Sequence, residues 1–405
     1  MLINNYNIPI TKVSLSDLEK EEVIKTLNSG WIVQGPKVAE FEREFSKFIN
    51  INYSVAVSSC TTALHLALLL LNVKKGDEVI IPSFTFVATA NVVEYANAKP
   101  IFADIDIKTF NISIDSILSI IESKKYKKLK VLIPVNLFGL CAKLDKITEI
   151  AKEYNLKVIE DSACGFASYL NGKHSGTFGD IGCFSFHPRK IITTGEGGML
   201  VTNDENIYKR AKKLRNHGAI LSDLKRHNLN SFYLSNYDEV GYNYRMTDLQ
   251  ASLGLIQLKR AQDILDKRYK IVKKYYNDLS DEKKLLLPYV PNNYIHSYQS
   301  FVVLFTNGYS LDEILNKKNK DLVKKIISRK ERFINYLSNI GISTRQGTHA
   351  VHLLTYYKNK YKIKDIDLYN SFLAHYLTIS LPLYDMTDSE YNYVIENIKI
   401  GLKKI

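Results

Sequence analysis

Cysteine is scarce in this chain of 405 residues, and its four cysteines are far apart. They are Cys60, Cys141, Cys164 and Cys183, and no CxxC pair occurs among them. Zinc and iron–sulfur sites use closely spaced cysteines, so this spacing argues against a metal site of either kind. Reduced thiols inside a cell are the simplest interpretation.

Long apolar runs are also missing. The longest, ALHLALLLL at Ala63–Leu71, is about half the length that a membrane-spanning helix needs. The N-terminus, MLINNYNIPITKV, lacks a basic stretch followed by an apolar run, so we expect no secretory signal. These absences predict a soluble, cytoplasmic protein that is not inserted in a membrane.

Nucleotide-binding loops of the common types are absent as well. The segment TTGEGG at 193–198 is neither GxGxxG opening a helix nor GxxxxGK[ST]. The net charge of +13 raises nucleic acid as a partner, but no zinc-finger spacing or RNA-binding signature accompanies it. Much of the excess lies in segments such as Leu315–Phe333, which predicts a solvated amphipathic helix. We therefore expect no nucleic-acid partner, whereas a phosphate-bearing substrate would suit the charge.

What the sequence does contain is an alternation of strand and helix patterns between Ser54 and Thr202. This alternation predicts an α/β domain with a mostly parallel sheet, whose ligands gather at the carboxyl ends of the strands. The seven runs that predict strands are VAVSS, EVIIP, KPIFADID, KVLIPV, KVIED, GCFSF and GMLVT.

The pattern changes near residue 263. A helix over 246–265 leads out of the first domain, and then helices alternate with the strands YQSFVVLF and TISLPLY. The last helix opens with a capping box from Thr387 to Glu390. We expect a large domain at 1–262 and a small α+β domain at 263–405.

A lysine and an acid lie where this sheet would bind a ligand. KVIED ends at Asp161, beside a second acid, Glu160, and Lys190 follows about thirty residues later at a strand-to-turn corner. Pyridoxal phosphate needs this pair: the lysine forms a Schiff base with it, and the acid keeps its pyridine nitrogen protonated.

Groups for the rest of that cofactor are also present. Phe86, in PSFTFVATAN, offers a ring for stacking. Ser59, Cys60 and Thr61 open a predicted helix, whose N-terminus favours a phosphate. Ser185, five residues before the lysine, offers a further hydroxyl.

Several long segments make the chain resemble the DegT/DnrJ/EryC1/StrS aminotransferases, sugar aminotransferases that use pyridoxal phosphate. The likeness runs from SGWIVQGPKVAEFE at Ser29 to the C-terminal LPLY. It implies fold type I of these enzymes, the aspartate aminotransferase type, as a homodimer with shared active sites. The segments are VSSCTTALHLAL, IPSFTFVATAN, VIEDSAC, GDIGCFSFHPRKIITTGEGG and GYNYRMTDLQASLGLIQL.

The resemblance also implies roles for single residues. Lys190 is the catalytic lysine that forms the Schiff base and moves the proton, and Asp161 pairs with the pyridinium nitrogen. Phe86 covers one face of the ring. The residues around the phosphate are Cys60 (through its backbone N–H), Thr61, Ser185 and, from the neighbouring subunit, Asn243.

The chain departs from the family's pattern at a few positions. Cys164 stands where a glutamine often contacts the cofactor's ring oxygen, and cysteine is a poorer hydrogen-bond donor. Asn136 and Phe138 stand where many members have His and Tyr or Phe. His349 and His352 lie in a region of the family's substrate channel, although packing explains them equally well.

The resemblance implies transfer of an amino group from L-glutamate to a keto group of a nucleotide-linked sugar of the 4-keto-6-deoxy type, for surface glycans. A smaller phosphorylated ketone is an alternative, which Asn136, Cys164 and the segment 219–238 keep open. A non-catalytic binding or regulatory protein on this fold is a second alternative, which Lys190 and Asp161 disfavour. Related sugar 3-dehydratases carry histidine in place of the lysine.

Overall fold

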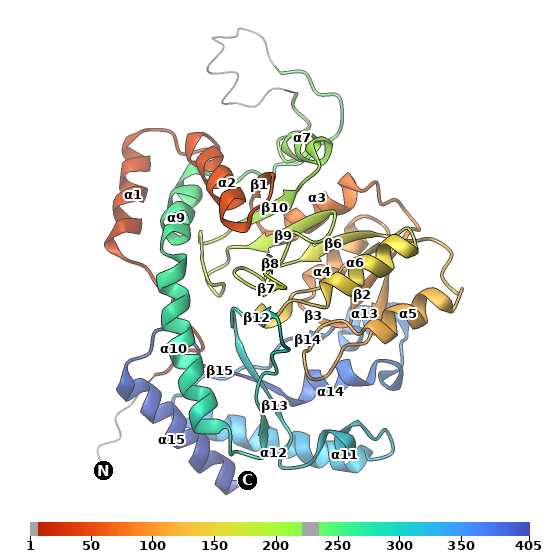
Figure 1. The fold of residues 1–405 in the computed structure, drawn as a ribbon, viewed down its shortest axis with the longest axis vertical. Helices are drawn as coiled ribbons and strands as arrows, with labels where there is room; N and C mark the ends of the chain where they lie inside the picture. Colours follow the sequence, from red (N-terminus) through yellow and green to blue (C-terminus); the bar gives the residue numbers. More distant parts are fainter. Residues whose placement is uncertain (1–6, 221–234) are drawn as a thin grey trace.

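The computed structural model describes residues 7–220 and 235–405, and a seven-stranded sheet forms its centre (Figure 1). The strand order is β1-β10-β9-β6-β5-β2-β4; β10 is antiparallel to β1 and β9, and the other neighbours are parallel. All seven strands overlap predicted runs, which confirms the α/β fold of type I. They are β1 (Tyr53–Val57), β2 (Glu78–Pro82), β4 (Lys99–Ala103), β5 (Leu129–Leu132), β6 (Lys157–Asp161), β9 (Ile181–Ser185) and β10 (Gly198–Thr202).

Helices cover both faces of this sheet, because alternate side chains of each buried strand point to opposite sides. In β1, Val55 and Val57 belong to one hydrophobic cluster, which includes α3 and α4, and Ala56 belongs to another, which includes α2 and α9. The helices of this region are α1 (Asp17–Asn28), α2 (Pro36–Ile49), α3 (Cys60–Leu70), α4 (Ala88–Tyr95), α5 (Ile114–Glu122), α6 (Leu144–Glu153), α7 (Glu205–Leu214) and α9 (Asp248–Lys259).

The helix expected over 246–265 is two helices. Thr247 caps α9 by accepting a hydrogen bond from the N–H of Gln250, and α9 ends at Lys259. Arg260, with φ −92° and ψ 4°, separates it from α10 (Ala261–Leu279). The proposed domain boundary after residue 262 therefore lies within α10, which runs down the side of the molecule in Figure 1.

The C-terminal region is built on a small antiparallel sheet of β11 (Leu285–Leu286), β13 (Phe301–Phe305) and β15 (Thr378–Leu381). Long helices pack on it through a shared apolar cluster, and the capping box from Thr387 to Glu390 is confirmed. These helices are α10, α11 (Leu311–Leu315), α12 (Lys320–Asn339), α14 (Tyr369–Leu377) and α15 (Asp388–Lys404). A further helix, α13 (Thr355–Tyr361), packs through Tyr357 in the cluster of the large sheet.

The helix predicted at Leu315–Phe333 has different limits. Asn316 interrupts it, because its side chain accepts a hydrogen bond from the Lys318 N–H at 3.1 Å and its carbonyl accepts one from the Asn319 N–H. The helix then runs from Lys320 to Asn339 as α12. One face of α12 is buried, and on it Lys330 is only 6% exposed. Burial lowers the pKa of this lysine to about 8.

Short strands connect the two regions. β14 (His349–Ala350) pairs with β3 (Phe84–Thr85), so a segment of the C-terminal region lies beside the loop that carries Phe86. A further small sheet joins β7 (Tyr169–Leu170), β8 (Lys173–His174) and β12 (Tyr294–Ile295). In the described part of the chain, no helix combines the length and apolar composition that a membrane span requires.

Candidate active site

The predicted site residues meet at the carboxyl edge of the large sheet. Asp161 is the last residue of β6, and Ser185 is the last residue of β9. These parallel strands are neighbours, with Asp161 opposite Cys183, so their ends adjoin. Lys190 lies in the turn after β9, where its N–H donates to the carbonyl of His187 at 2.8 Å.

Asp161 is only 4% exposed, and both of its carboxylate oxygens accept hydrogen bonds. Oδ2 accepts from Thr89 Oγ1 at 2.8 Å, and Oδ1 accepts from the backbone N–H of Ala163 at 3.1 Å. Burial raises the pKa of Asp161 and outweighs these hydrogen bonds and the charge of Lys190, which lower it. A buried carboxylate of this kind gains from a positive partner, such as a protonated pyridine nitrogen.

Glu160, the neighbouring acid, points to the opposite side of β6, because side chains alternate along a strand. It is fully buried and accepts the backbone N–H groups of Gly176, Phe178 and Gly179 at 2.6, 2.6 and 2.9 Å. Burial raises the pKa of Glu160 more than these hydrogen bonds lower it. Glu160 therefore holds a loop in place, and Asp161 is the acid that lies near Lys190.

Lys190 is half-buried, and its Nζ donates to the Sγ of Cys164 at 3.1 Å. Burial lowers the pKa of Lys190, but Cys164, Cys60 and Asp161 raise it, and the net direction is upward. The lysine is therefore a cation at neutral pH when it carries no covalent partner. The thiol that replaces the family's usual glutamine thus contacts the lysine directly, which the sequence did not predict.

The first turn of α3 forms the other end of the site. Ser59 caps the helix by accepting a backbone N–H at 3.1 Å, and the N–H groups of Cys60 and Thr61 precede the first intrahelical bonds. Gly198 lies against this turn: a Cβ there would be 2.4 Å from the carbonyl carbon of Ser59. Gly198 also pairs with Ser185 across β9 and β10. The missing side chain thus lets β10, and with it the end of β9 that carries Ser185, lie against the first turn of α3.

Phe86 is 62% exposed, although it lies between β3 and α4 close to the buried carboxylate. Its carbonyl accepts the N–H of Thr89 at 3.2 Å, and Thr89 in turn donates to Asp161. The exposed ring of Phe86, one helical turn before Thr89, could stack on a flat aromatic cofactor.

Asn243 is exposed, in an extended segment beside the edge strand β1. It pairs with Asn216, and the next residue, Tyr244, accepts the N–H of Ser58 at 2.9 Å. This segment thus lies next to the residue before the capping serine of α3. Within one chain it borders the phosphate end of the site, and its assignment to the neighbour's site stays a prediction.

Asn136 serves the structure of the protein. Its Nδ2 donates to Ser162 Oγ at 2.8 Å and to Glu160 at 3.3 Å, and its Oδ1 accepts the Ala142 N–H at 2.9 Å. Phe138 is buried as well, with a left-handed φ of 58°. These contacts leave neither side chain facing solvent.

The two histidines differ in their surroundings. His352 is 1% exposed, its Nδ1 lies 2.6 Å from Ser83 Oγ, and burial lowers the pKa of this histidine to about 4. It is therefore a neutral, packed side chain at physiological pH. His349 is exposed on β14, opposite Thr85 of β3.

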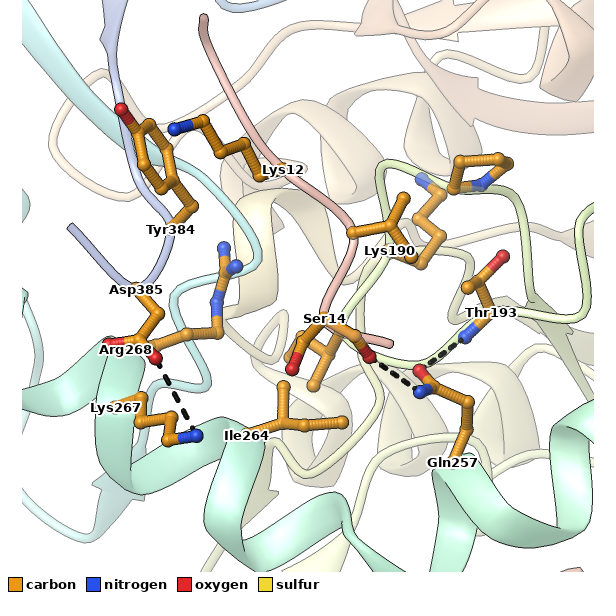
Figure 2. A pocket seen from close by; sticks show the side chains of 13 residues that line it. Lys12, Ser14, Lys190, Thr193, Gln257, Ile264, Lys267, Arg268, Tyr384 and Asp385 are labelled. Carbon is orange, nitrogen blue, oxygen red and sulfur yellow. Dashed lines mark hydrogen bonds and ion pairs between the residues drawn. The ribbon is translucent and has the colours of Figure 1, made fainter. Parts of the chain in front are cut away.

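A small hollow lies beside the turn that carries Lys190, as Figure 2 shows. Gln257 borders it, accepting the Thr193 N–H at 3.4 Å and donating to the Ser14 carbonyl at 2.8 Å. Asp161 is not among its described lining residues, so the hollow lies behind the turn and not at the carboxylate. Gln257 thus ties the lysine-bearing turn to the N-terminal segment.

These residues fit pyridoxal phosphate. A lysine for covalent attachment, a buried acid for the ring nitrogen, an exposed ring and a helix N-terminus with nearby hydroxyls lie at one edge of a seven-stranded sheet. When bound, this cofactor supplies an electron sink for amino-group transfer. The fold and the site define a pyridoxal-phosphate-dependent transaminase.

Comparison with known proteins identifies the family. The family model described as the DegT/DnrJ/EryC1/StrS aminotransferase family matches residues 14–399. The chain belongs to this family, as its motifs indicated.

Similar proteins match the chain over most of its length. SpsC of Bacillus subtilis, a spore coat polysaccharide biosynthesis protein, is 34% identical over 396 residues, 98% of this chain and 97% of that one. GDP-perosamine synthase of Escherichia coli O157:H7 is 36% identical over 356 residues, 88% of each chain. Spr1654 of Streptococcus pneumoniae has been solved in PMP- and PLP-forms; the PMP-form is 29% identical, with TM-score 0.86 and coverage of 98% and 100%. Pyridoxal phosphate and the transaminase class are thereby confirmed.

Sequence reasoning missed Thr89, the side-chain partner of Asp161. The signal was its place in FTFVATAN, three residues after Phe86 and so one helical turn away. Nothing in the local pattern showed that this turn faces β6.

Reduction of the purified protein with borohydride should fix the cofactor to Lys190, and peptide mapping by mass spectrometry would locate the adduct. Lys190→Ala should bind the cofactor without a covalent bond and should not turn over, because the amine that moves the proton is gone. Lys173, whose ammonium lies over the ring of Phe178, offers a matched control, and Lys173→Ala should keep its activity. An adduct on Lys143 or Lys173 would contradict the assignment.

The two neighbouring acids should respond in opposite ways. Asp161→Asn should lose at least ~100-fold in kcat, because an amide cannot hold a proton on the ring nitrogen by charge. Its ligand-free melting temperature should not fall, because the Asn oxygen can still accept the N–H of Ala163 while the rotatable hydroxyl of Thr89 can accept from the new NH2 group. The substitution also removes the cost of ionising a carboxyl whose pKa is raised in the folded state. Glu160→Gln should melt several degrees lower, because its amide group would face the N–H donors of Gly176 and Gly179. Turnover near the wild-type rate in Asp161→Asn would refute the assignment of this acid.

Proposed function

We propose that this transaminase moves an amino group from L-glutamate to a keto group of a nucleotide-linked sugar, of the 4-keto-6-deoxy type, for surface glycans. The observation that carries the proposal is that Lys190 lies near enough to buried Asp161 for its charge to act on the pKa of that acid, in a chain 36% identical to a GDP-perosamine synthase. The reaction needs a base at the lysine and a cofactor ring kept positive by the acid.

In this proposal each residue has one task. Lys190 binds the cofactor and, once released, carries a proton on its Nζ between positions of the substrate. Asp161 keeps the ring nitrogen protonated, and Phe86 excludes water from one face of the ring. Cys164 lies beside the lysine amine and limits where it can move. The phosphate would be held by Cys60 and Thr61 at the N-terminus of α3, by Ser185, and by Asn243 of the partner subunit.

Positive charge near the lysine supports anionic substrates. Arg189, next to Lys190, and Arg345 are both exposed, and burial together with the charge of Arg345 lowers the pKa of Arg189. No carboxylate contributes to that shift in the described part of the chain. Two guanidinium groups that have no carboxylate partner among the described residues suit the carboxylates of glutamate or the phosphates of a nucleotide.

A smaller phosphorylated ketone remains the second candidate acceptor. The departure at Asn136 no longer supports this candidate, because the Asn136 side chain is hydrogen-bonded to Ser162, Glu160 and Ala142 and does not face a substrate. The contact of Cys164 with the lysine keeps it open. The segment 219–238 falls largely outside the described residues.

An apolar surface near the N-terminus supports a homodimer. Large apolar side chains of α1 and of the loops on either side of it are between 47% and 57% exposed, which is unusual for a monomer surface. The loop after α1 adjoins the segment of Asn243, since the N–H of Asp248 donates to the Val33 carbonyl at 3.0 Å. The exposed residues are Leu15, Leu18, Ile24, Leu27, Ile32 and Val33.

The substrate proposal is tested with the holoenzyme and L-glutamate, followed by release of 2-oxoglutarate and by the cofactor's absorption. Nucleotide-linked 4-keto sugars should discharge the amino form of the cofactor, and small phosphorylated ketones should not. A higher kcat/KM for a phosphorylated ketone would select the second candidate. Failure of every acceptor and of glutamate to change the spectrum would favour a non-catalytic protein.

The shared site is tested by mixing two defective variants. Asn243→Asp sets a carboxylate against the cofactor phosphate and should weaken cofactor binding, and Lys190→Ala is inactive for chemical reasons. With random re-association about half of the dimers are mixed, and each contains one site with both lesions and one with neither. Activity should therefore return at about a quarter of the sites. Mixed dimers that form and restore nothing would assign Asn243 to its own subunit.

A further inference from the structure

Two buried threonines, Thr89 and Thr85, form a line of hydroxyl contacts that ends at Asp161. Thr89 Oγ1 lies 2.8 Å from Asp161 Oδ2, and Thr85 Oγ1 lies 3.0 Å from Thr89 Oγ1. Thr89 is 0% exposed and Thr85 is 1% exposed, so neither hydroxyl contacts bulk water. Hydrogen bonds to a charged group in such surroundings are worth more than those at a surface.

The number of hydroxyl protons determines which threonine donates to which. A hydroxyl carries one proton, and the hydroxyl of Thr89 uses it on the carboxylate of Asp161. Thr85 must then donate to Thr89 for their 3.0 Å contact to be a hydrogen bond. Each donation makes the next donor stronger, and both favour the ionised form of the carboxylate.

Both ends of the line are anchored. Thr89 lies in the first turn of α4, and its N–H donates to the carbonyl of Phe86 at 3.2 Å. Thr85 lies on β3, paired with His349 of β14, so the C-terminal region fixes its backbone. The backbone positions from which both hydroxyls extend are therefore fixed relative to the sheet.

Few other groups act on the carboxylate. From the neighbouring elements, Lys190, Cys60 and Cys183 face it, and burial raises the pKa of both cysteines well above the ordinary value, so these two are neutral. Glu160 points to the other side of β6. In the described structure, Lys190 is thus the charged side chain near Asp161, and it becomes neutral or covalently bound when it reacts.

We propose that Thr89 is the positioning residue of Asp161: its hydroxyl, oriented by Thr85, fixes the carboxylate and keeps it ionised while the charge at Lys190 changes. The inference rests on the proposed pairing of Asp161 with the cofactor's ring nitrogen. With the hydroxyl present, the proton stays on the ring nitrogen; without it, Asp161 becomes more basic and draws that proton toward itself.

The test compares Thr89→Val, which keeps the shape and removes the hydroxyl, with Thr89→Ser, which keeps the hydroxyl. Pyridoxal phosphate is titrated into the ligand-free proteins, and the absorption of the bound cofactor is then followed against pH. Thr89→Val should bind the cofactor about tenfold more weakly, the loss of one hydrogen bond to a charge. Its absorption should change at a higher pH, by at least ~0.5 unit, because a less positive ring acidifies the nitrogen of Lys190 less.

A purely structural role predicts something different. It would lower the melting temperature of the ligand-free Thr89→Val protein and leave the pH of the absorption change at the wild-type value, which would overturn the proposal. Thr26→Val is the matched control: the hydroxyl of this buried threonine donates to the Glu22 carbonyl of its own helix, so its loss should change neither the cofactor affinity nor the absorption midpoint. If Thr89→Val does not fold, Thr85→Val should shift the absorption midpoint in the same direction by less, and no shift would refute the line of donors.

A second comparison separates this proposal from the role of Asp161 itself. In the Asp161→Asn background, Thr89→Val should have no further effect on the absorption midpoint, because the two changes act on one interaction. If Asp161→Asn alone leaves cofactor affinity and the midpoint unchanged, the assignment of Asp161 is wrong. If Asp161→Asn changes the cofactor affinity and the absorption midpoint while Thr89→Val changes neither quantity, the assignment of Asp161 stands and the proposal for Thr89 is wrong.

Discussion

A carboxylate buried at the end of a central strand is the constraint on which the site depends. Placing Asp161 in a dry position is costly, and the chain offsets this with the hydroxyl of Thr89, the N–H of Ala163 and the nearby charge of Lys190. The offset is incomplete, since the pKa of the acid stays raised. A positive ring nitrogen beside Asp161 would stabilise the ionised carboxylate and remove the remaining desolvation cost. The free energy gained in this way contributes to the affinity for the cofactor.

The same strand shows how one sheet separates structure from chemistry. Glu160 and Asp161 are adjacent acids, yet the alternation of β6 sends the first to the N–H groups of Gly176 and Gly179 and the second to the site. A shift of one residue in the pairing of β6 with β9 would exchange their positions. The loop would then lose its acceptor and the site its acid. Register is therefore a functional requirement here.

The seven central strands were predictable because each is a short apolar run that needs burial on both faces. The limits of helices were less so: the break at Arg260 and the turn at Asn316 depend on local backbone geometry within helix-forming sequence. In the site, the positions of Asp161 and Lys190 follow from strand ends. The contacts of Thr89 with Asp161 and of Cys164 with Lys190 join residues 72 and 26 positions apart, and no local pattern contains them.

The helix α10 has a consequence for dissecting the molecule into fragments. Its first turns bury Ala261, Ile264 and Leu265 in the core beneath the large sheet, whereas Ile271 and Tyr275 belong to the core of the C-terminal region. A gene truncated after residue 262 would remove Ile264 and Leu265 from the large core and expose the apolar side chains that pack against them. A fragment of the large region should instead extend past Leu265. A partner fragment begun near Ile271 would still lack Phe84, Phe110 and Phe138, which the large region contributes to its core.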